Sequence, residues 1–163
     1  MPSIDTLPTV SEAKLVIDNN YQRFLDKKFI NELSLDIIGY SVANEVQLRD
    51  YLLGYPMESN DFMTAFEYIA YLTENVAEYH RAPFHAVLAS FLFESGLKDE
   101  ANASLDKCEA LSPNYSLAGL LRRVIEANWS PNNFMLMRES THGKVVKQLT
   151  EMASLKITAD TLA

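Results

Sequence analysis

The chain has little of what a disulfide-bonded, all-β or membrane-spanning protein needs. Its 163 residues include one Cys, five Gly and six Pro. A single Cys cannot form an internal disulfide, and so few turn-forming residues argue against a fold of many strands. No apolar run approaches the ~18–20 residues that span a bilayer, and residues 1–10 lack the basic and apolar regions of a secretory signal. We therefore expect a cytoplasmic protein with no membrane partner.

The sequence also lacks the motifs of common catalytic and cofactor sites. It contains no Gly-x4-Gly-Lys-Ser/Thr and no Gly-x-Gly-x-x-Gly pattern, so phosphate cradling has no support. The three His and the single Cys follow no zinc-ligand spacing, and no Ser, His and acid spacing suggests a triad. We interpret Cys108 as a small packed side chain rather than a nucleophile. We expect no enzyme activity, no cofactor and no metal.

Acidic side chains are concentrated in the first half of the chain, and the formal net charge is −8. Residues 1–80 hold thirteen acidic and five basic side chains, whereas residues 81–163 hold nine of each. An acidic surface repels phosphates, so direct nucleic-acid binding is disfavoured. Two interpretations stay open: a solvated surface that keeps the domain soluble, or a docking face for a basic partner.

Apolar residues recur at helical spacing through most of the chain, which predicts an all-α fold. The pattern indicates about eight helices, over residues 9–28, 44–53, 60–79, 83–95, 98–111, 114–125, 131–137 and 143–155. Periodicity does not separate a short strand, a turn of helix and a buried loop for residues 29–40. We expect one helical domain over residues 9–155, between a flexible tail at 1–8 and a frayed tail at 156–163.

One predicted helical hairpin, at about residues 83–113, has the most specific pattern. Ala89 and Ala101 are small enough for two helices to approach closely, Gly96 suits the turn between them, and Pro113 ends the second helix. This pattern resembles a tetratricopeptide hairpin, which implies antiparallel helical hairpins packed as a bundle or short solenoid. The ~34-residue period of that family does not recur, so flanking helices or a second copy must cover the hairpin.

A wider set of residues resembles the C-terminal helical part of an actinobacterial family of unknown function. The matching features, over about residues 47–138, are Arg49-Asp50, Ala82-Pro83, Gly96, Ala101-x3-Leu105, Pro113-x-Tyr115-x-Leu117-Ala118-x2-Leu121 and Pro131. The resemblance implies a helical fold and brings no activity with it.

Three tyrosines flank the apolar face of the helix predicted at 60–79. Tyr68, Tyr71 and Tyr79 lie side by side if each residue advances by ~100°. A tyrosine suits a binding groove because its ring is apolar and its hydroxyl stays hydrated. Burial of the same residues in the core is the alternative interpretation.

A second candidate surface lies in the basic stretch near residue 125. Arg122, Arg123 and Trp129 belong to the residue types that dominate binding hot spots. The alternative is a solvated basic face with Trp129 folded onto the preceding helix.

Arg49 and Asp50 are adjacent helical residues, and adjacent side chains on a helix do not face each other. We therefore expect each of them to tether its helix to a neighbouring helix rather than to pair with the other. Contact with a ligand is the alternative.

These observations favour a protein–protein interaction module that recognises a partner helix or peptide through a helical groove. The acidic first half and the more basic tail could also pair between two copies, which suggests a homodimer. One alternative function is an acidic nucleic-acid mimic that inhibits a DNA-binding protein, encoded by a phage or mobile element. The other alternative is a helical pocket for a small molecule or a reaction.

Overall fold

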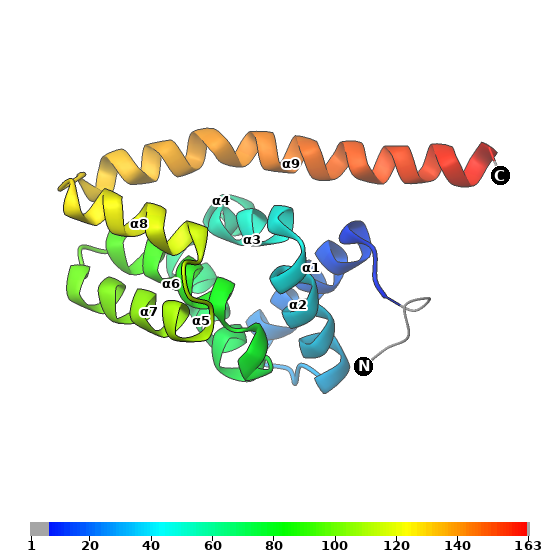
Figure 1. Cartoon of the computed structure of the whole chain (residues 1–163). Coiled ribbons are helices and arrows are strands. Elements are labelled where there is room, and N and C mark those ends of the chain that lie inside the picture. The colour runs from blue at the N-terminus through cyan, green and yellow to red at the C-terminus, as the bar shows by residue number, and fades with distance from the viewer. Residues whose placement is uncertain (1–6, 163) are drawn as a thin grey trace.

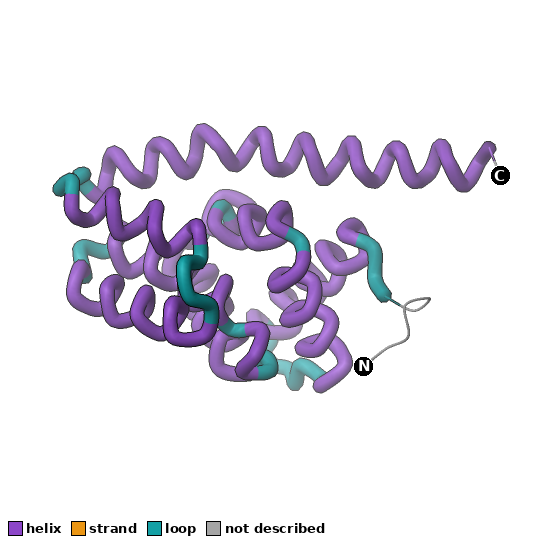
Figure 2. The backbone as a smooth tube through the Cα atoms, in the orientation of Figure 1, coloured by secondary structure: helices purple, strands orange, loops and turns teal. Residues whose placement is uncertain are grey.

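The structure, a computed structural model, describes residues 7–162, and it describes side chains for residues 7–154. These residues fold into helices joined by short links, as Figures 1 and 2 show. The elements are α1 (Val10–Leu25), α2 (Glu32–Asn44), α3 (Val46–Leu53), α4 (Tyr55–Ser59), α5 (Phe62–Asn75), the 3₁₀ turn η2 (Glu78–His80), α6 (Ala82–Glu94), α7 (Lys98–Leu111), α8 (Ser116–Glu126) and α9 (Pro131–Leu162). The all-α prediction is confirmed. Most of the predicted tail at residues 1–8 lies outside the described residues.

Residues 32–40, whose secondary structure periodicity left undecided, are helical and belong to α2. Asn31 starts α2 by accepting a hydrogen bond from the backbone N–H of Ser34 at 2.8 Å, which satisfies a donor that the first helical turn leaves unpaired. α2 approaches the end of α5 closely: a Cβ atom added at Gly39 would lie 3.1 Å from Cβ of Val76. The strand and loop alternatives for residues 32–40 are therefore wrong.

α5 ends at Asn75, four residues before the predicted end at Tyr79. The next residue, Val76, has extended backbone angles. The Arg81 guanidinium donates to the carbonyl oxygens of Glu74 and Val76, both at 3.0 Å, so these carbonyls have partners without a further helical turn. Tyr79 therefore belongs to η2, and it leaves the helix face that carries Tyr68 and Tyr71.

The hairpin predicted at about residues 83–113 is present as α6 and α7, which pack along their lengths. Ala89 and Ala101 are both buried at the contact. Gly96 has a φ of +80°, a conformation that favours glycine, and it links the two helices. The hairpin matches its predicted boundaries within one residue, and its tetratricopeptide-like character stays a prediction.

α9 is one helix where two were predicted, and it runs along one side of the molecule (Figure 1). Its start agrees with the sequence pattern, because Ser130 Oγ accepts a hydrogen bond from the Asn133 N–H at 3.1 Å. The predicted link at Gly143 is wrong. A glycine inside a helix costs ~1 kcal/mol relative to alanine but keeps its backbone hydrogen bonds. The backbone of residues 156–162, predicted to fray, continues α9.

The core consists of two apolar clusters that share α6. The first joins α1 to α5 with one side of α6, which contributes Phe84, Val87 and Phe91. The second joins α6, α7 and α8 with the start of α9, and there α6 contributes Ala89 and Phe93. A helix that is apolar on all sides belongs in the interior. α6 is therefore the central helix of the fold.

A hydrogen-bonded group of tyrosines holds α1 against α3, α4 and α5. The hydroxyls of Tyr51 and Tyr55 donate to the same oxygen of Asp18, at 2.8 and 3.1 Å. The Tyr68 hydroxyl donates to the carbonyl oxygen of Ile17 at 2.8 Å. Burial raises the pKa of all three tyrosines, so their hydroxyls stay protonated and act as donors.

Two polar contacts hold α9 to the rest of the molecule. Arg138 Nε lies 3.0 Å from both carboxylate oxygens of Glu94, and the two side chains are 6% and 4% exposed. Burial raises the pKa of Glu94, although Arg138 pulls it down. One turn further along, His142 Nε2 lies 2.8 Å from Glu58 Oε1, and the His142 ring packs where a Cβ atom at Gly54 would sit.

The contact at Gly54 gives a first prediction. In Gly54→Ala the new methyl group overlaps the His142 ring, which must move away from Glu58. We expect the free energy of unfolding to fall by ~1–3 kcal/mol, measured by urea denaturation. Gly119→Ala is the control, because a Cβ atom there has no atom within 4 Å; it should leave stability unchanged or higher. Equal effects of the two substitutions would contradict the close packing of His142.

The buried Glu94–Arg138 pair gives a second prediction. Glu94→Ala leaves the Arg138 charge buried without its partner, so we expect a loss of ~3–5 kcal/mol in the free energy of unfolding. The double variant Glu94→Leu/Arg138→Met replaces both charges with apolar groups and should recover most of that loss. Chemical denaturation of both variants gives the comparison. A double variant as unstable as Glu94→Ala would contradict this account of the pair.

Candidate functional site

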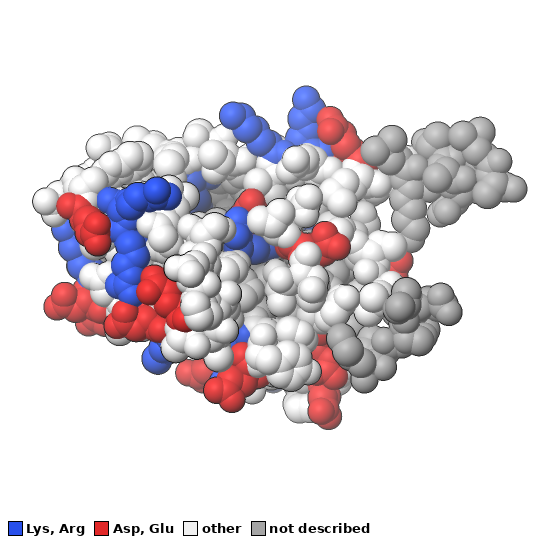
Figure 3. All heavy atoms as spheres, in the orientation of Figure 1, with Lys and Arg blue, Asp and Glu red and all other residues white. Residues whose placement is uncertain are grey.

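An apolar groove lies between α8 and α9, with the end of α3 at its floor. A cavity of about 320 Å³ opens there, lined among others by Leu53, Leu117, Leu120, Leu121, Phe134 and Met137. We call this site the α8–α9 groove. Figure 3 shows this face of the molecule, with a largely uncharged band between α9 at the top and α8 beneath it.

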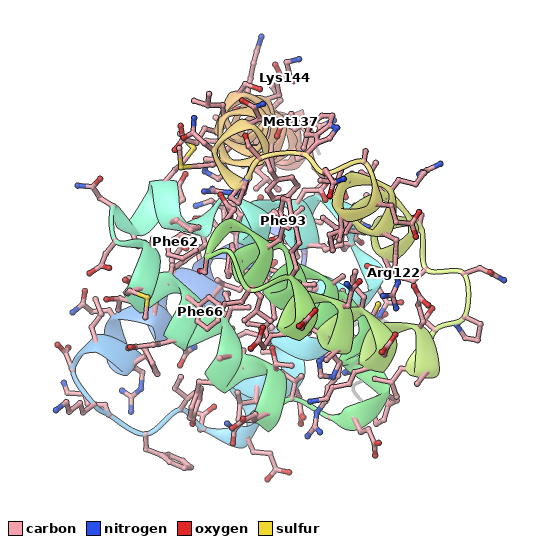
Figure 4. All side chains as sticks on the ribbon, turned by 90° about the vertical axis from the view of Figure 1, so that its left-hand side faces the viewer. Phe62, Phe66, Phe93, Arg122, Met137 and Lys144 are labelled. Atoms are coloured by element: carbon pink, nitrogen blue, oxygen red, sulfur yellow. The ribbon has the colours of Figure 1, made fainter. Side chains whose placement is uncertain are left out.

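The walls of the groove follow from the way in which α8 and α9 are joined. α8 buries Leu117 and Leu121 in the second core cluster, which leaves Leu120 on the adjoining flank, 45% exposed. Residues 127–130 then turn the chain, with Asn128 at a φ of +56°. In Figure 4 Met137 lies on the side of α9 that faces α8. Leu120 and Met137 therefore line the groove from opposite helices.

A second hollow adjoins the groove, and Met137 lines both. This hollow contains Trp129 and Leu136, which are 41% and 53% exposed. Large apolar side chains gathered on a surface, rather than scattered singly, are typical of interaction sites. Trp129, predicted as a binding residue, therefore lies at the end of a continuous apolar surface.

Arg49 and Asp50 lie at the other end of the groove. The expectation that these neighbours do not pair is wrong: Arg49 Nε and Nη2 lie 3.0 and 2.7 Å from Asp50 Oδ1. The arginine side chain is long enough to fold back over the angle between adjacent helical positions. It also packs against Tyr115, with the guanidinium carbon 5.9 Å from the ring centroid, and so links α3 to the start of α8.

The predicted basic corner separates into two different roles. Arg122 faces α7, where it forms ion pairs with Asp106 and Glu109 (Figure 4). Arg123, the next residue, is exposed to solvent. Arg122 therefore stabilises the packing of α7 and α8, and Arg123 is the arginine of this pair that remains accessible to a partner.

The three predicted tyrosines do not form one surface. Tyr68 is fully buried in the first core cluster, as the alternative interpretation had it. Tyr71 is partly buried and lines a shallow hollow with Phe24. Tyr79 is 79% exposed on η2, beside His80. The early end of α5 separates Tyr79 from the other two, and within α5 Tyr68 faces the core while Tyr71 lies at its edge.

Burial shifts the pKa values of two titratable side chains near the core. Burial raises the pKa of the Cys108 thiol to about 12, and burial lowers the pKa of His85. The described residues contain no group of three or more His, Cys, Asp or Glu side chains placed to hold a metal ion. None of the helices in residues 7–162 has the length and apolar character that crossing a membrane requires.

Sequence analysis did not identify Leu120, Leu136 and Met137 as site residues. Leu120 lies in the helix predicted at 114–125, and Leu136 and Met137 lie at the end of the short helix predicted at 131–137. A signal was available: α8 has a strongly one-sided apolar pattern whose edge extends to Leu120. The sequence pattern did not predict that α9 continues as one helix through Gly143.

The chain matches no protein-family model, no curated protein and no solved structure. The tetratricopeptide-like and actinobacterial resemblances therefore stay predictions from the sequence. The function is inferred below from the geometry of the α8–α9 groove and from the charges around it.

The burial of Cys108 gives a third prediction. Because the raised pKa keeps the thiol protonated at neutral pH, a thiol reagent should label Cys108 slowly in the native protein and rapidly in guanidinium. Ser116→Cys, in a Cys108→Ser background, supplies an exposed thiol for comparison. Native Cys108 that reacts as fast as the thiol at position 116 would show that the site is open.

Proposed function

We propose that the protein is a protein–protein interaction module that binds an amphipathic helix or apolar peptide of a partner in the α8–α9 groove. The observation that carries this proposal is the continuous run of accessible apolar side chains from Leu120 through Met137 to Leu136 and Trp129. A partner helix would place one or two apolar anchors in the cavity and lay its apolar face along the walls.

Two features of the groove favour a peptide over a small molecule. Its cavity adjoins the hollow at Trp129 through the shared side chain of Met137, whereas a small-molecule site encloses most of its ligand. The guanidinium of Arg49, at its edge, is already paired with the carboxylate of Asp50. We further propose that the protein acts in the cytoplasm without catalysis.

The acidic-mimic alternative has less support. A mimic of nucleic acid needs rows of carboxylates on one surface, and the face in Figure 3 carries basic as well as acidic side chains. Arg122 and Lys14 also pair with Asp106 and Asp18, so part of the acidic charge is neutralised within the protein.

Leu120→Glu tests the proposed function. The substitution puts a charge on the groove wall at a side chain that is already exposed, so the fold should persist. Affinity purification from the native host should recover a partner with the original protein and lose it, by about tenfold or more, with the variant. Leu15→Glu is the matched control, because Leu15 is exposed on α1, away from the groove.

Comparison of Leu120→Glu with Leu15→Glu decides whether the groove binds the partner. A partner that is retained by Leu15→Glu and lost by Leu120→Glu supports the groove. A partner retained equally by both variants would contradict it. The molecular mass of the purified chain, measured by light scattering, tests in parallel the proposal that a second copy is the partner.

A further inference from the structure

We infer that the partner segment bound by the α8–α9 groove carries acidic residues beside its apolar ridge, and that Arg123 and Lys144 recognise them. This inference rests on the proposed function, because it names the chemistry of the segment that would occupy the same groove. Three observations support it: which basic side chains are already paired, where the unpaired ones lie, and where the nearby carboxylates point.

Three arginines near the groove are already paired within the protein. Arg49 binds Asp50, Arg122 binds Asp106 and Glu109, and Arg138 binds Glu94. These side chains hold helices together, and a partner could use them only by breaking an existing ion pair. They are therefore poor candidates for recognition of a new ligand.

Two other basic side chains are exposed and unpaired. Among the described side chains, Arg123 and Lys144 take part in no recorded hydrogen bond or ion pair, and both are exposed. Arg123 lies three residues after Leu120, and Lys144 lies seven residues after Met137. Residues at these spacings share one face of a helix. The two cations therefore stand on opposite rims of the groove, one on α8 and one on α9.

The figures agree with this placement. Figure 4 shows Lys144 projecting from the outer side of α9, further from the body of the molecule than Met137. In Figure 3 basic side chains project from α9 above the uncharged band of the groove. An occupant of the groove would meet a positive charge at each rim before it reached the apolar walls.

Carboxylates near the groove do not cancel these rim charges. Asp50 is occupied by Arg49. Glu139 lines a hollow on the other flank of α9, together with Glu94. Glu126 follows Arg123 by three residues and is exposed on the same side of α8, but the two side chains form no ion pair. The groove thus has a local positive rim on a chain whose formal net charge is −8.

Exposed charges at the rim of a groove mainly determine which partner binds there. Complementary rim charges speed the encounter and add modest affinity, while like charges disfavour the wrong partner. An apolar ridge with flanking Glu or Asp would pair with both rims, and one with flanking Lys or Arg would be repelled by both. Rim pairs are exposed to solvent, so their contribution falls as salt increases.

Two synthetic helical peptides with the same leucine ridge test the inference, one flanked by Glu and the other by Lys. Trp129, the only Trp of the chain, lies at the end of the groove, so its fluorescence reports binding directly. We expect the Glu-flanked peptide to bind about tenfold or more tightly at low salt. The difference should shrink near 1 M salt, where the screening length is ~3 Å.

Charge reversal provides the matched variants. Arg123→Glu/Lys144→Glu should invert the preference between the two peptides. Lys27→Glu/Lys28→Glu changes the net charge by the same amount on the link after α1, and should leave the preference as it was. An unchanged preference in the first variant, or an inverted one in the second, would overturn the assignment to Arg123 and Lys144.

The outcomes separate this inference from the proposed function. Equal binding of both peptides, abolished by Leu120→Glu, would keep the groove and overturn the charge recognition. Absence of binding by either peptide would count against the groove itself and against the inference with it. Preferential binding of the Lys-flanked peptide would overturn the charge recognition alone.

Discussion

The buried ion pair between Glu94 and Arg138 determines where α9 lies, and the groove depends on that position. Glu94 is the last residue of α6, the helix that both core clusters share. A bidentate contact fixes distance and orientation together. α9 is thereby placed beside α8 without close packing along their length, and the space between the two helices becomes the groove. A purely apolar contact would define this geometry less sharply, because apolar packing has little directionality.

Much of the fold could be predicted because its signals are local. The α6–α7 hairpin follows from two small residues, one glycine and one proline, and these act within a few residues of where they stand. The cap at Asn31 is just as local. The helix that follows it is apolar on several sides, so periodicity could not decide whether this stretch is helix, strand or loop. The end of α5 depends on Arg81, a side chain from beyond the helix, and no periodic pattern contains that information.

The site was harder to predict because it depends on contacts between distant segments. Trp129 was identified by residue type, and its exposure at the α8–α9 turn agrees with that choice. Arg122 and Tyr68 are of equally suitable types, yet one is paired with α7 and the other is buried in the core. Composition indicates which side chains can bind a partner, but only the packing of helices far apart in sequence decides which of them remain accessible.

Gly143 divides α9 into two parts with different attachments. Arg138 and His142 hold the part before Gly143, whereas Leu149 packs the later part against the first core cluster. Helices open most easily where the backbone is least restrained, and proteins unfold locally in such units. Local opening of α9 therefore starts most easily at Gly143, between these two attachments.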